Sequence, residues 1–186
     1  MAEERKTKNE KRKVPLIVRL ARWRVPLGFA SSAAVLYLAR PTPRSLAIGG
    51  AIAVVGEAMR LWAAGHLDKG REVTKSGPYR FTRHPLYLGS AVVAAGVAVA
   101  SDNTTVALIV AIYLALAVGS AVRHEEENMR VRFGREYETY LQQTVSPVTR
   151  HFSFERAMKV NKEYEAIVGL IAGGLILAAK VALSRD

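Results

Sequence analysis

The chain has 186 residues, a net charge of +11 at neutral pH and no cysteine. Without cysteine it has no disulfide bond, no thiolate nucleophile and no cysteine-bound metal. Its cations flank long apolar blocks, which is the pattern of a membrane protein facing anionic lipid and argues against a nucleic-acid-binding protein. The histidines show no metal-ligand spacing, so we expect no metal site. They are His66, His84, His124 and His151.

The first 24 residues form a basic arm that contains nine cations and three acidic residues. We expect about the first dozen of them to be disordered. Between Val14 and Trp23 apolar and basic residues alternate, which predicts a helix that lies on the membrane surface and binds anionic lipid headgroups. The charged region is too long for a secretory signal peptide, and no small-residue cleavage site follows it.

Five apolar blocks follow the arm, and a helix needs about 20 apolar residues to cross a bilayer. Ser45–Gly65 and Tyr164–Leu183 are long enough, and Val106–Val122 is slightly short. Val25–Ala39 and Leu86–Ala100 are shorter still, so they cross only if flanking residues join them or the bilayer is locally thinner. We predict an all-α integral membrane bundle with about five transmembrane helices.

The connections between these blocks alternate in charge. The N-terminal arm, the loop 66–85 and the segment 123–163 are rich in cations, and the positive-inside rule puts such segments in the cytoplasm. The short connections 40–44 and 101–105 then lie outside, together with the C-terminus.

Two charged residues lie inside the second apolar block. Glu57 and Arg60 are three residues apart and share one helical face. Because charges within a membrane are costly, they commonly mark a functional cavity, and we assign both residues to substrate binding. The alternative is a mutual ion pair in which Arg60 reaches the cytoplasmic interface.

Glycines recur on two of the apolar blocks. Gly49, Ala53 and Gly56 predict close helix packing in the second block, and Gly169 with Gly173 predicts the same in the last. The last pair could serve contacts within the bundle, which we favour, or a dimer. The protein is therefore expected to be a monomer or a homodimer.

Two polar stretches lie at the mouths of the third and fourth predicted helices. Ser76–Gly89, SGPYRFTRHPLYLG, combines a Gly-Pro turn, three cationic or imidazole donors and Pro85, which suits the first position of a helix. Arg123–Pro147, RHEEENMRVRFGREYETYLQQTVSP, begins with three glutamates that should continue the fourth helix out of the membrane. Alone, the second stretch could be a solvated helix with i,i+4 pairs such as Glu126 with Arg130.

The two stretches have complementary chemistry. Guanidinium and imidazole groups of the first can bind a carboxylate or phosphate, and carboxylates of the second can bind an ammonium group or a ribose diol. Tyrosines can cover an aromatic base while their hydroxyls remain in water. They are Tyr79, Tyr87, Tyr137 and Tyr140. The glycine signatures of dinucleotide folds and P-loops are absent from the sequence.

The stretch GPYRFTRHPLYLG, followed some forty residues later by EE and then FGREYETY, resembles the C-terminal motif of the isoprenylcysteine carboxyl methyltransferase and phospholipid methyltransferase family. The resemblance covers about residues 76–147. Family members are integral membrane enzymes that bind S-adenosylmethionine in a cytosolic pocket built from these two motifs. The resemblance implies a methyltransferase that acts on a lipophilic acceptor entering from the bilayer.

The resemblance also implies individual roles. The family's RHPxYxG motif falls on Arg83, His84, Pro85, Tyr87 and Gly89, and its paired glutamates fall on Glu125 and Glu126. We assign the cofactor to these residues together with Gly77, Tyr79, Arg80 and Tyr137. We assign catalysis to His84, Glu126 and Arg130. The family's proline after the tyrosines corresponds to Pro147, with Ser146 and Thr149 beside it.

The acceptor class remains open at this point. A carboxylate acceptor needs no base, and a cation could orient it. The candidates for that role are Arg60, Arg80 and Arg130. An amine acceptor must first lose a proton to a base such as Glu57, Glu126 or His84. In either case holding the reactants in line can lower the barrier by roughly 7 to 11 kcal/mol.

Two other functions fit parts of the chain. Steroid-reductase relatives share some of this architecture and use a nicotinamide cofactor, so a lipid double-bond reductase with NADPH is one alternative. A non-enzymatic membrane scaffold is the other, but it leaves the joint occurrence of GPYR, RHP and the glutamate pair unexplained. On the methyltransferase interpretation the chain has four parts: the basic arm with its interfacial helix (1–24), two transmembrane helices (25–65), the motif core with two more (66–150), and an amphipathic segment with the fifth (151–186).

Overall fold

A computed structural model describes residues 16–142 and 150–184 of the chain. Within these ranges every regular element is helical, as predicted, and none is a strand. The long helices are α2 (Leu16–Leu38), α3 (Pro43–His66), α4 (Pro85–Ser101), α5 (Thr104–Phe133) and α7 (Glu163–Leu183). Three short elements complete the fold: a 3₁₀ turn η1 (Gly77–Arg80), the helix α6 (Arg135–Leu141) and a π-helical turn η2 (Arg156–Val160).

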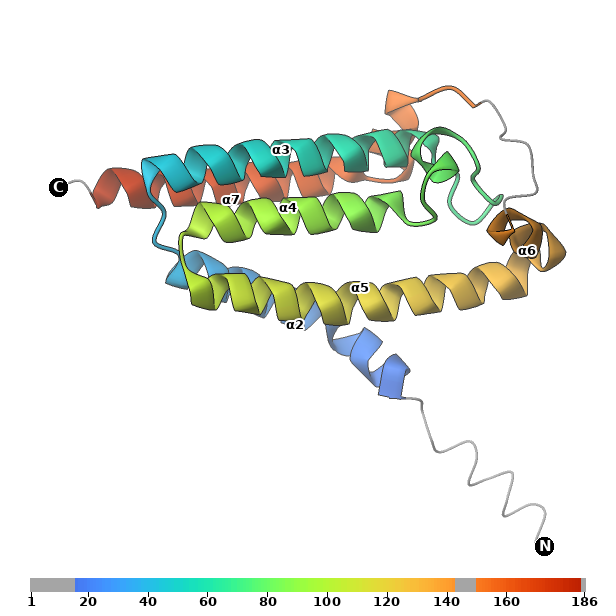
Figure 1. The fold of residues 1–186 in the computed structure, drawn as a ribbon, viewed down its shortest axis with the longest axis horizontal. Helices are drawn as coiled ribbons and strands as arrows, with labels where there is room; N and C mark the ends of the chain where they lie inside the picture. Colours follow the sequence, from blue (N-terminus) through green and yellow to red (C-terminus); the bar gives the residue numbers. More distant parts are fainter. Residues whose placement is uncertain (1–15, 143–149, 185–186) are drawn as a thin grey trace, which may run out of the picture.

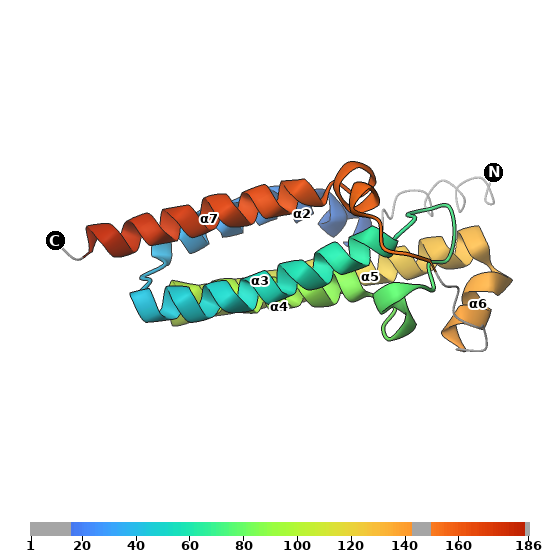
Figure 2. The same ribbon diagram turned by 90° about the horizontal axis from the view of Figure 1, so that it is seen from above.

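The five long helices form an elongated bundle (Figure 1). The helices α3 and α4 pack against each other along their length, and α5 contacts α2 and α4. Seen from above, α2 and α7 lie on one side and the α3–α4 pair lies on the other (Figure 2). By length and composition α3, α5 and α7 can each cross a membrane, whereas the apolar helices Pro26–Leu38 and Pro85–Ser101 are shorter. These two are the blocks that the sequence predicted to be short.

Small residues explain the close approach of α3 and α4. A Cβ added to Gly49 would lie 2.3 Å from the backbone nitrogen of Ala100, and one added to Gly56 would lie 2.5 Å from that of Val93. The predicted packing role of this helix face is therefore correct.

The glycines of α7, for which the sequence also predicted close packing, behave differently. No described atom lies within 4 Å of a Cβ added to Gly169 or Gly173, so these glycines do not bring α7 close to another helix of the bundle. They border a cavity instead, because α7 stands away from the α3–α4 pair.

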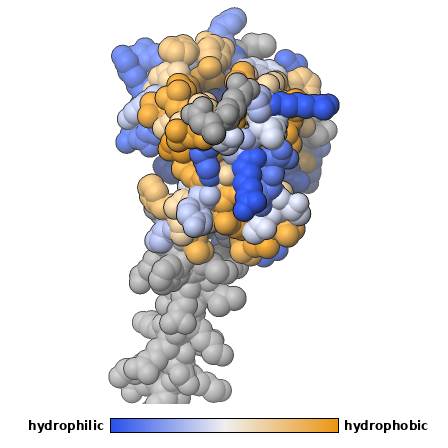
Figure 3. All heavy atoms as spheres, turned by 90° about the vertical axis from the view of Figure 1, so that its left-hand side faces the viewer, coloured by the Kyte–Doolittle hydropathy of each residue, from blue (hydrophilic) through white to orange (hydrophobic). Residues whose placement is uncertain are grey.

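The short connections 40–44 and 101–105 meet at one end of the bundle. The Arg40 amide donates to Ser101 O at 2.8 Å, and Asn103 Nδ2 donates to Leu38 O at 3.0 Å. Lys180 Nζ donates to Ala39 O at 2.6 Å, which ties α7 to the end of α2. Viewed end-on, hydrophilic side chains gather here beside hydrophobic ones (Figure 3). The opposite end of the bundle carries the long polar segments.

The helix α2 runs through the boundary that we expected near residue 24. It extends from Leu16 to Leu38 with Pro26 inside it. Proline lacks an N–H and its ring clashes with the preceding turn, so a helix can continue past it only with a bend. The first turns of α2 lead away from the bundle (Figure 1). The remainder of the basic arm, residues 1–15, lies outside the described residues.

Candidate active site

The two predicted motifs meet at the polar end of the bundle. Pro85 occupies the start of α4, and the glutamates lie on the part of α5 that extends beyond its apolar stretch. His84 Nε2 lies 3.2 Å from Glu126 Oε1, and Arg83 Nη1 lies 3.5 Å from the same oxygen. The mouths of the third and fourth predicted helices are therefore adjacent, as a shared site requires.

A polar pocket of about 240 Å³ opens beside this contact. Six of the residues that we assigned to the cofactor line it. They are Tyr79, Arg83, His84, Pro85, Tyr87 and Glu125. Arg60, assigned to the substrate, lines it too. Ser90, Asn161 and Glu163, which we had not assigned to any site, also line the pocket.

The paired glutamates differ in their surroundings. Glu126 is held by Arg83 and His84 and is not among the described residues that line the pocket. Glu125 lines the pocket and makes no hydrogen bond or ion pair with the described residues. It also lies near Tyr79, whose phenol pKa is raised first by burial and then by the Glu125 charge. Glu125 thus offers the pocket a carboxylate, whereas Glu126 positions the turn before α4.

Two of the predicted glycines act through packing. Gly77 has a φ of +55°, and a Cβ on it would lie 2.4 Å from the His66 ring, so only glycine lets this turn close over His66. A Cβ on Gly89 would lie 2.7 Å from Cγ of Arg60. This glycine therefore gives the Arg60 side chain room to pass along α4.

The other assigned residues lie away from the pocket. Arg80 is exposed on η1, and Arg130 pairs with Glu138 on the surface at 3.2 Å. Tyr137 is buried against Tyr140, and this burial raises the pKa of its phenol. Ser146, Pro147 and Thr149 lie outside the described residues.

The helix α6 folds back and secures η1. Gly134, with a φ of +47°, ends α5 and lets the chain reverse. The Tyr140 hydroxyl then donates to Tyr79 O at 2.9 Å, and Lys75 Nζ lies 2.9 Å from Glu136 Oε1. Burial, followed by the neighbouring Tyr137, raises the pKa of Tyr140 to about 12, so its hydroxyl remains a donor at physiological pH.

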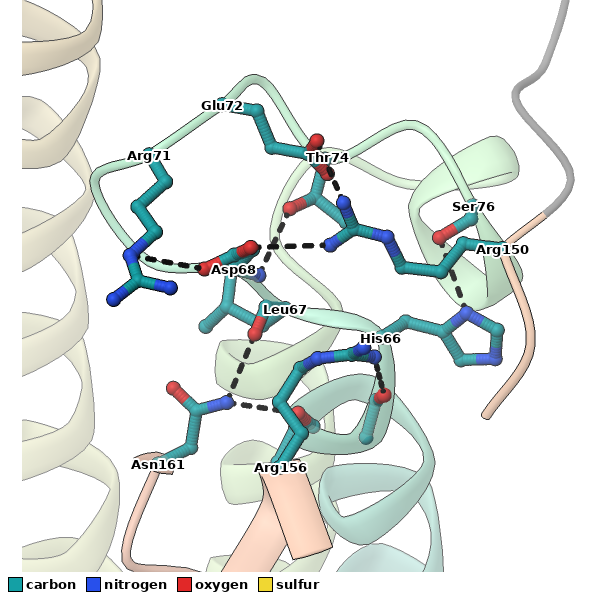
Figure 4. Close-up of polar contacts among 12 residues, drawn as sticks. His66, Leu67, Asp68, Arg71, Glu72, Thr74, Ser76, Arg150, Arg156 and Asn161 are labelled. Carbon is teal, nitrogen blue, oxygen red and sulfur yellow. Dashed lines mark hydrogen bonds and ion pairs between the residues drawn. The ribbon is translucent and has the colours of Figure 1, made fainter. Parts of the chain in front are cut away.

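A second set of polar contacts holds the loop after α3 in place (Figure 4). Arg150 Nη2 lies 2.7 Å from Glu72 Oε2, and its Nη1 lies 3.6 Å from Asp68 Oδ2. His66 Nδ1 is 3.1 Å from Ser76 Oγ inside the same loop. The loop that carries η1 is therefore pinned from two directions, by α6 and by the segment after residue 149.

The same segment caps the end of α3. Arg156 Nη1 donates to Gly65 O at 2.6 Å, and Asn161 Nδ2 donates to Ala64 O at 2.8 Å and Leu67 O at 3.0 Å. These contacts satisfy carbonyls that a helix end otherwise leaves unpaired. Asn161, whose contacts are drawn in Figure 4, also lines the polar pocket.

An apolar cavity of about 560 Å³ lies inside the bundle. Residues of all five long helices line it, including the α7 glycines that make no close packing contact. At its polar end it reaches Glu57, Arg60 and Ser90. Because Arg60 and Ser90 line both spaces, the apolar cavity and the polar pocket meet at these two side chains.

Arg60 is surrounded by partners at this junction. Its Nε lies 3.3 Å from Glu57 Oε2, and its Nη2 lies 2.5 Å from Glu163 Oε1. Its Nη1 donates to the Ser90 hydroxyl. The sequence left open whether Glu57 and Arg60 form an ion pair or border a cavity, and they do both.

Glu163 was missed by the sequence analysis. It opens α7, and its side chain is only 4% exposed. An acidic residue in the first turn of a helix is favoured by the helix dipole alone, so its position gave no sign of a distant partner. Only the fold brings α7 against α3 at this point.

The fold and these two spaces define a helical membrane protein with a polar pocket at one end and an apolar cavity inside. Residues 46–136 match the model of the phospholipid methyltransferase family. This match confirms the resemblance of that segment to a family of membrane methyltransferases.

One curated relative extends the comparison. Over 99 residues the chain is 32% identical to the nickel-cobalt-cadmium resistance protein NccN of Alcaligenes xylosoxydans xylosoxydans. The match covers 52% of this chain and 45% of that protein, so the chain spans less than half the length of this relative. No solved structure matches the chain.

Proposed function

We propose that the protein transfers a methyl group from S-adenosylmethionine to a lipophilic acceptor that enters from the bilayer. The observation that carries the proposal is the meeting of a polar pocket and an apolar cavity at Arg60 and Ser90. A water-soluble donor and a membrane-soluble acceptor need separate binding spaces whose ends touch. The family match supports the reaction class.

The groups around the polar pocket fit S-adenosylmethionine. Glu125 offers a carboxylate to the ammonium group, and Arg83 and His84 offer donors to the carboxylate. The rings of Tyr79 and Tyr87 offer apolar surface to the base. The volume of about 240 Å³ is slightly below the roughly 300 to 1,000 Å³ of sites for drug-sized ligands, so the pocket encloses part of the cofactor.

The apolar cavity supplies the acceptor site. Its volume of about 560 Å³ lies within the range for small-molecule sites, and its lining is almost entirely apolar. The acceptor's reactive group would lie at the Arg60 end and its chain along α7. The bound cofactor supplies an electrophilic methyl group, and the protein contributes chiefly by holding both reactants in line.

The polar end faces the cytoplasm in this proposal. The long loop 66–84 and the segment after α5 gather there, and both are rich in cations. The cofactor, which is soluble in the cytosol, would then reach the pocket directly.

Calorimetric titration of the full-length protein in detergent tests the donor. We expect binding of S-adenosylmethionine and of its demethylated product. Absence of binding for both, together with thermal protection by NADPH, would instead support the reductase and overturn the proposal. Transfer of labelled methyl into a lipid extract, with the products separated by class, tests the reaction and identifies the acceptor.

A further inference from the structure

We infer that Glu163, which lies outside the family segment, makes the acceptor site selective for an amine headgroup over a carboxylate. The inference rests on the proposed function and concerns the polar end of the same apolar cavity. It is carried by the ion cluster of Glu57, Arg60 and Glu163.

The first step is the charge of the cluster. Two carboxyl groups share one guanidinium, so the cluster holds one more acidic group than it holds cations. Both acids are largely shielded from water, with side chains 12% and 4% exposed. A buried charge without a full partner is costly, which favours a ligand that brings a positive charge.

The second step is the state of Arg60. Its three nitrogens already lie beside Glu57, Glu163 and Ser90. A carboxylate acceptor would approach Arg60 beside the acidic side chains of Glu57 and Glu163, whose charge repels it. Such repulsion against one ligand class is a common source of specificity.

The third step is an oxygen atom that is free to accept a hydrogen bond. Glu57 lines the apolar cavity, and its Oε1 is buried without a hydrogen-bond partner among the described residues. A buried oxygen without a hydrogen-bond partner is unfavourable until a donor binds to it. An ammonium N–H is a suitable donor, and a carboxylate has none to offer.

The reaction balances with these groups. An ammonium acceptor gives one proton to Glu57, and the freed nitrogen lone pair forms the new N–C bond to the methyl carbon. The C–S bond of the sulfonium breaks, and its electron pair stays on sulfur. The product is an N-methylated ammonium, and the proton on Glu57 leaves through the polar pocket. Glu163 acts as a positioning residue because it touches Arg60 rather than the reacting atoms.

Dodecylamine and dodecanoate test the inference because they share one chain and differ in headgroup charge. We expect the wild-type protein in nanodiscs to bind the amine at least about tenfold more tightly. Glu163→Gln releases one donor of Arg60 and should reduce this preference at least about tenfold. Glu163→Asp keeps the carboxyl group and should retain most of the preference for the amine.

Glu165→Gln is the matched control, since Glu165 is exposed on the same turn of α7. It should leave the preference unchanged, and thermal unfolding checks that each variant is folded. A preference for dodecanoate, or one unaltered by Glu163→Gln in a folded protein, overturns the inference. Failure to bind S-adenosylmethionine would count against the proposed function, which the headgroup comparison does not measure.

Discussion

At the scale of single residues, the paired glutamates of the second motif have different surroundings. Glu126 is engaged by Arg83 and His84, whereas Glu125 faces the pocket. Sequence alone could not separate them, because adjacent positions on a helix lie about 100° apart and either could have faced the cation cluster. The fold resolves which carboxylate is available to a ligand.

Glu125→Gln should weaken binding of S-adenosylmethionine about ten- to a hundredfold. The variant keeps the shape of the side chain but loses a charged hydrogen bond, which is typically worth about 1.5 to 3 kcal/mol. Titration calorimetry measures the change. Glu127→Gln provides the control because Glu127 is exposed on the same helix, and equal losses in both variants would argue against the assignment.

At the scale of elements, the contact between α3 and α4 sets the position of the site. Arg60 and Ser90 lie on these two helices, so their separation depends on the small residues that bring the backbones together. This feature was predictable, because the glycine spacing is visible in the sequence. The contacts of Arg150 and Asn161 with the loop after α3 and with the end of α3 were not predictable, because nothing in the local sequence indicates which loop a polar segment will cover.

Gly49→Ala should lower the free energy of unfolding by about 1 to 3 kcal/mol, the usual cost of overpacking. The new methyl group would lie 2.3 Å from the backbone of Ala100. Thermal unfolding in detergent gives the measurement. Gly119→Ala serves for comparison, since no described atom lies within 4 Å of its Cβ, and it should be neutral or slightly stabilising.

Tyr140→Phe should cost about 0.5 to 1.5 kcal/mol by removing the hydrogen bond from α6 to Tyr79 O. Since the pKa of this phenol is raised to about 12, its stabilisation is complete below the ordinary value of about 10 and is lost as pH rises through 12. The difference between wild type and variant should therefore be constant from pH 6 to 9, roughly. Tyr37→Phe, at an exposed site, should have no effect.

At the scale of the whole molecule, the polar pocket and the apolar cavity differ in how far the sequence predicts them. The polar pocket could be anticipated from two motifs with complementary charges. The apolar cavity could not, because it depends on the space that the fold leaves between α7 and the α3–α4 pair. The glycines on α7 suggested close packing. Their spacing in the sequence does not show whether they contact a neighbouring helix or border a cavity.

Gly173→Leu should reduce methyl transfer to lipophilic acceptors at least about tenfold while leaving cofactor binding within about twofold. The leucine would occupy the apolar cavity and not the polar pocket. Transfer assays with labelled cofactor, paired with calorimetry, separate the two effects. Gly119→Leu on the exposed face of α5 is the size-matched control. Unchanged transfer by the Gly173 variant would exclude the cavity as the acceptor site.

The two ends of α7 are fastened in different ways. Glu163 contacts Arg60 at one end, and Lys180 donates to the Leu36 and Tyr37 carbonyls of α2 at the other. At 1.5 Å per residue these anchors are about 26 Å apart, close to the roughly 30 Å of a bilayer core. The stretch between them carries the glycines and contributes to the cavity wall. On the proposed function, the distance between the anchors would limit how much of the acceptor's hydrocarbon chain can lie against α7 when its headgroup reaches Arg60.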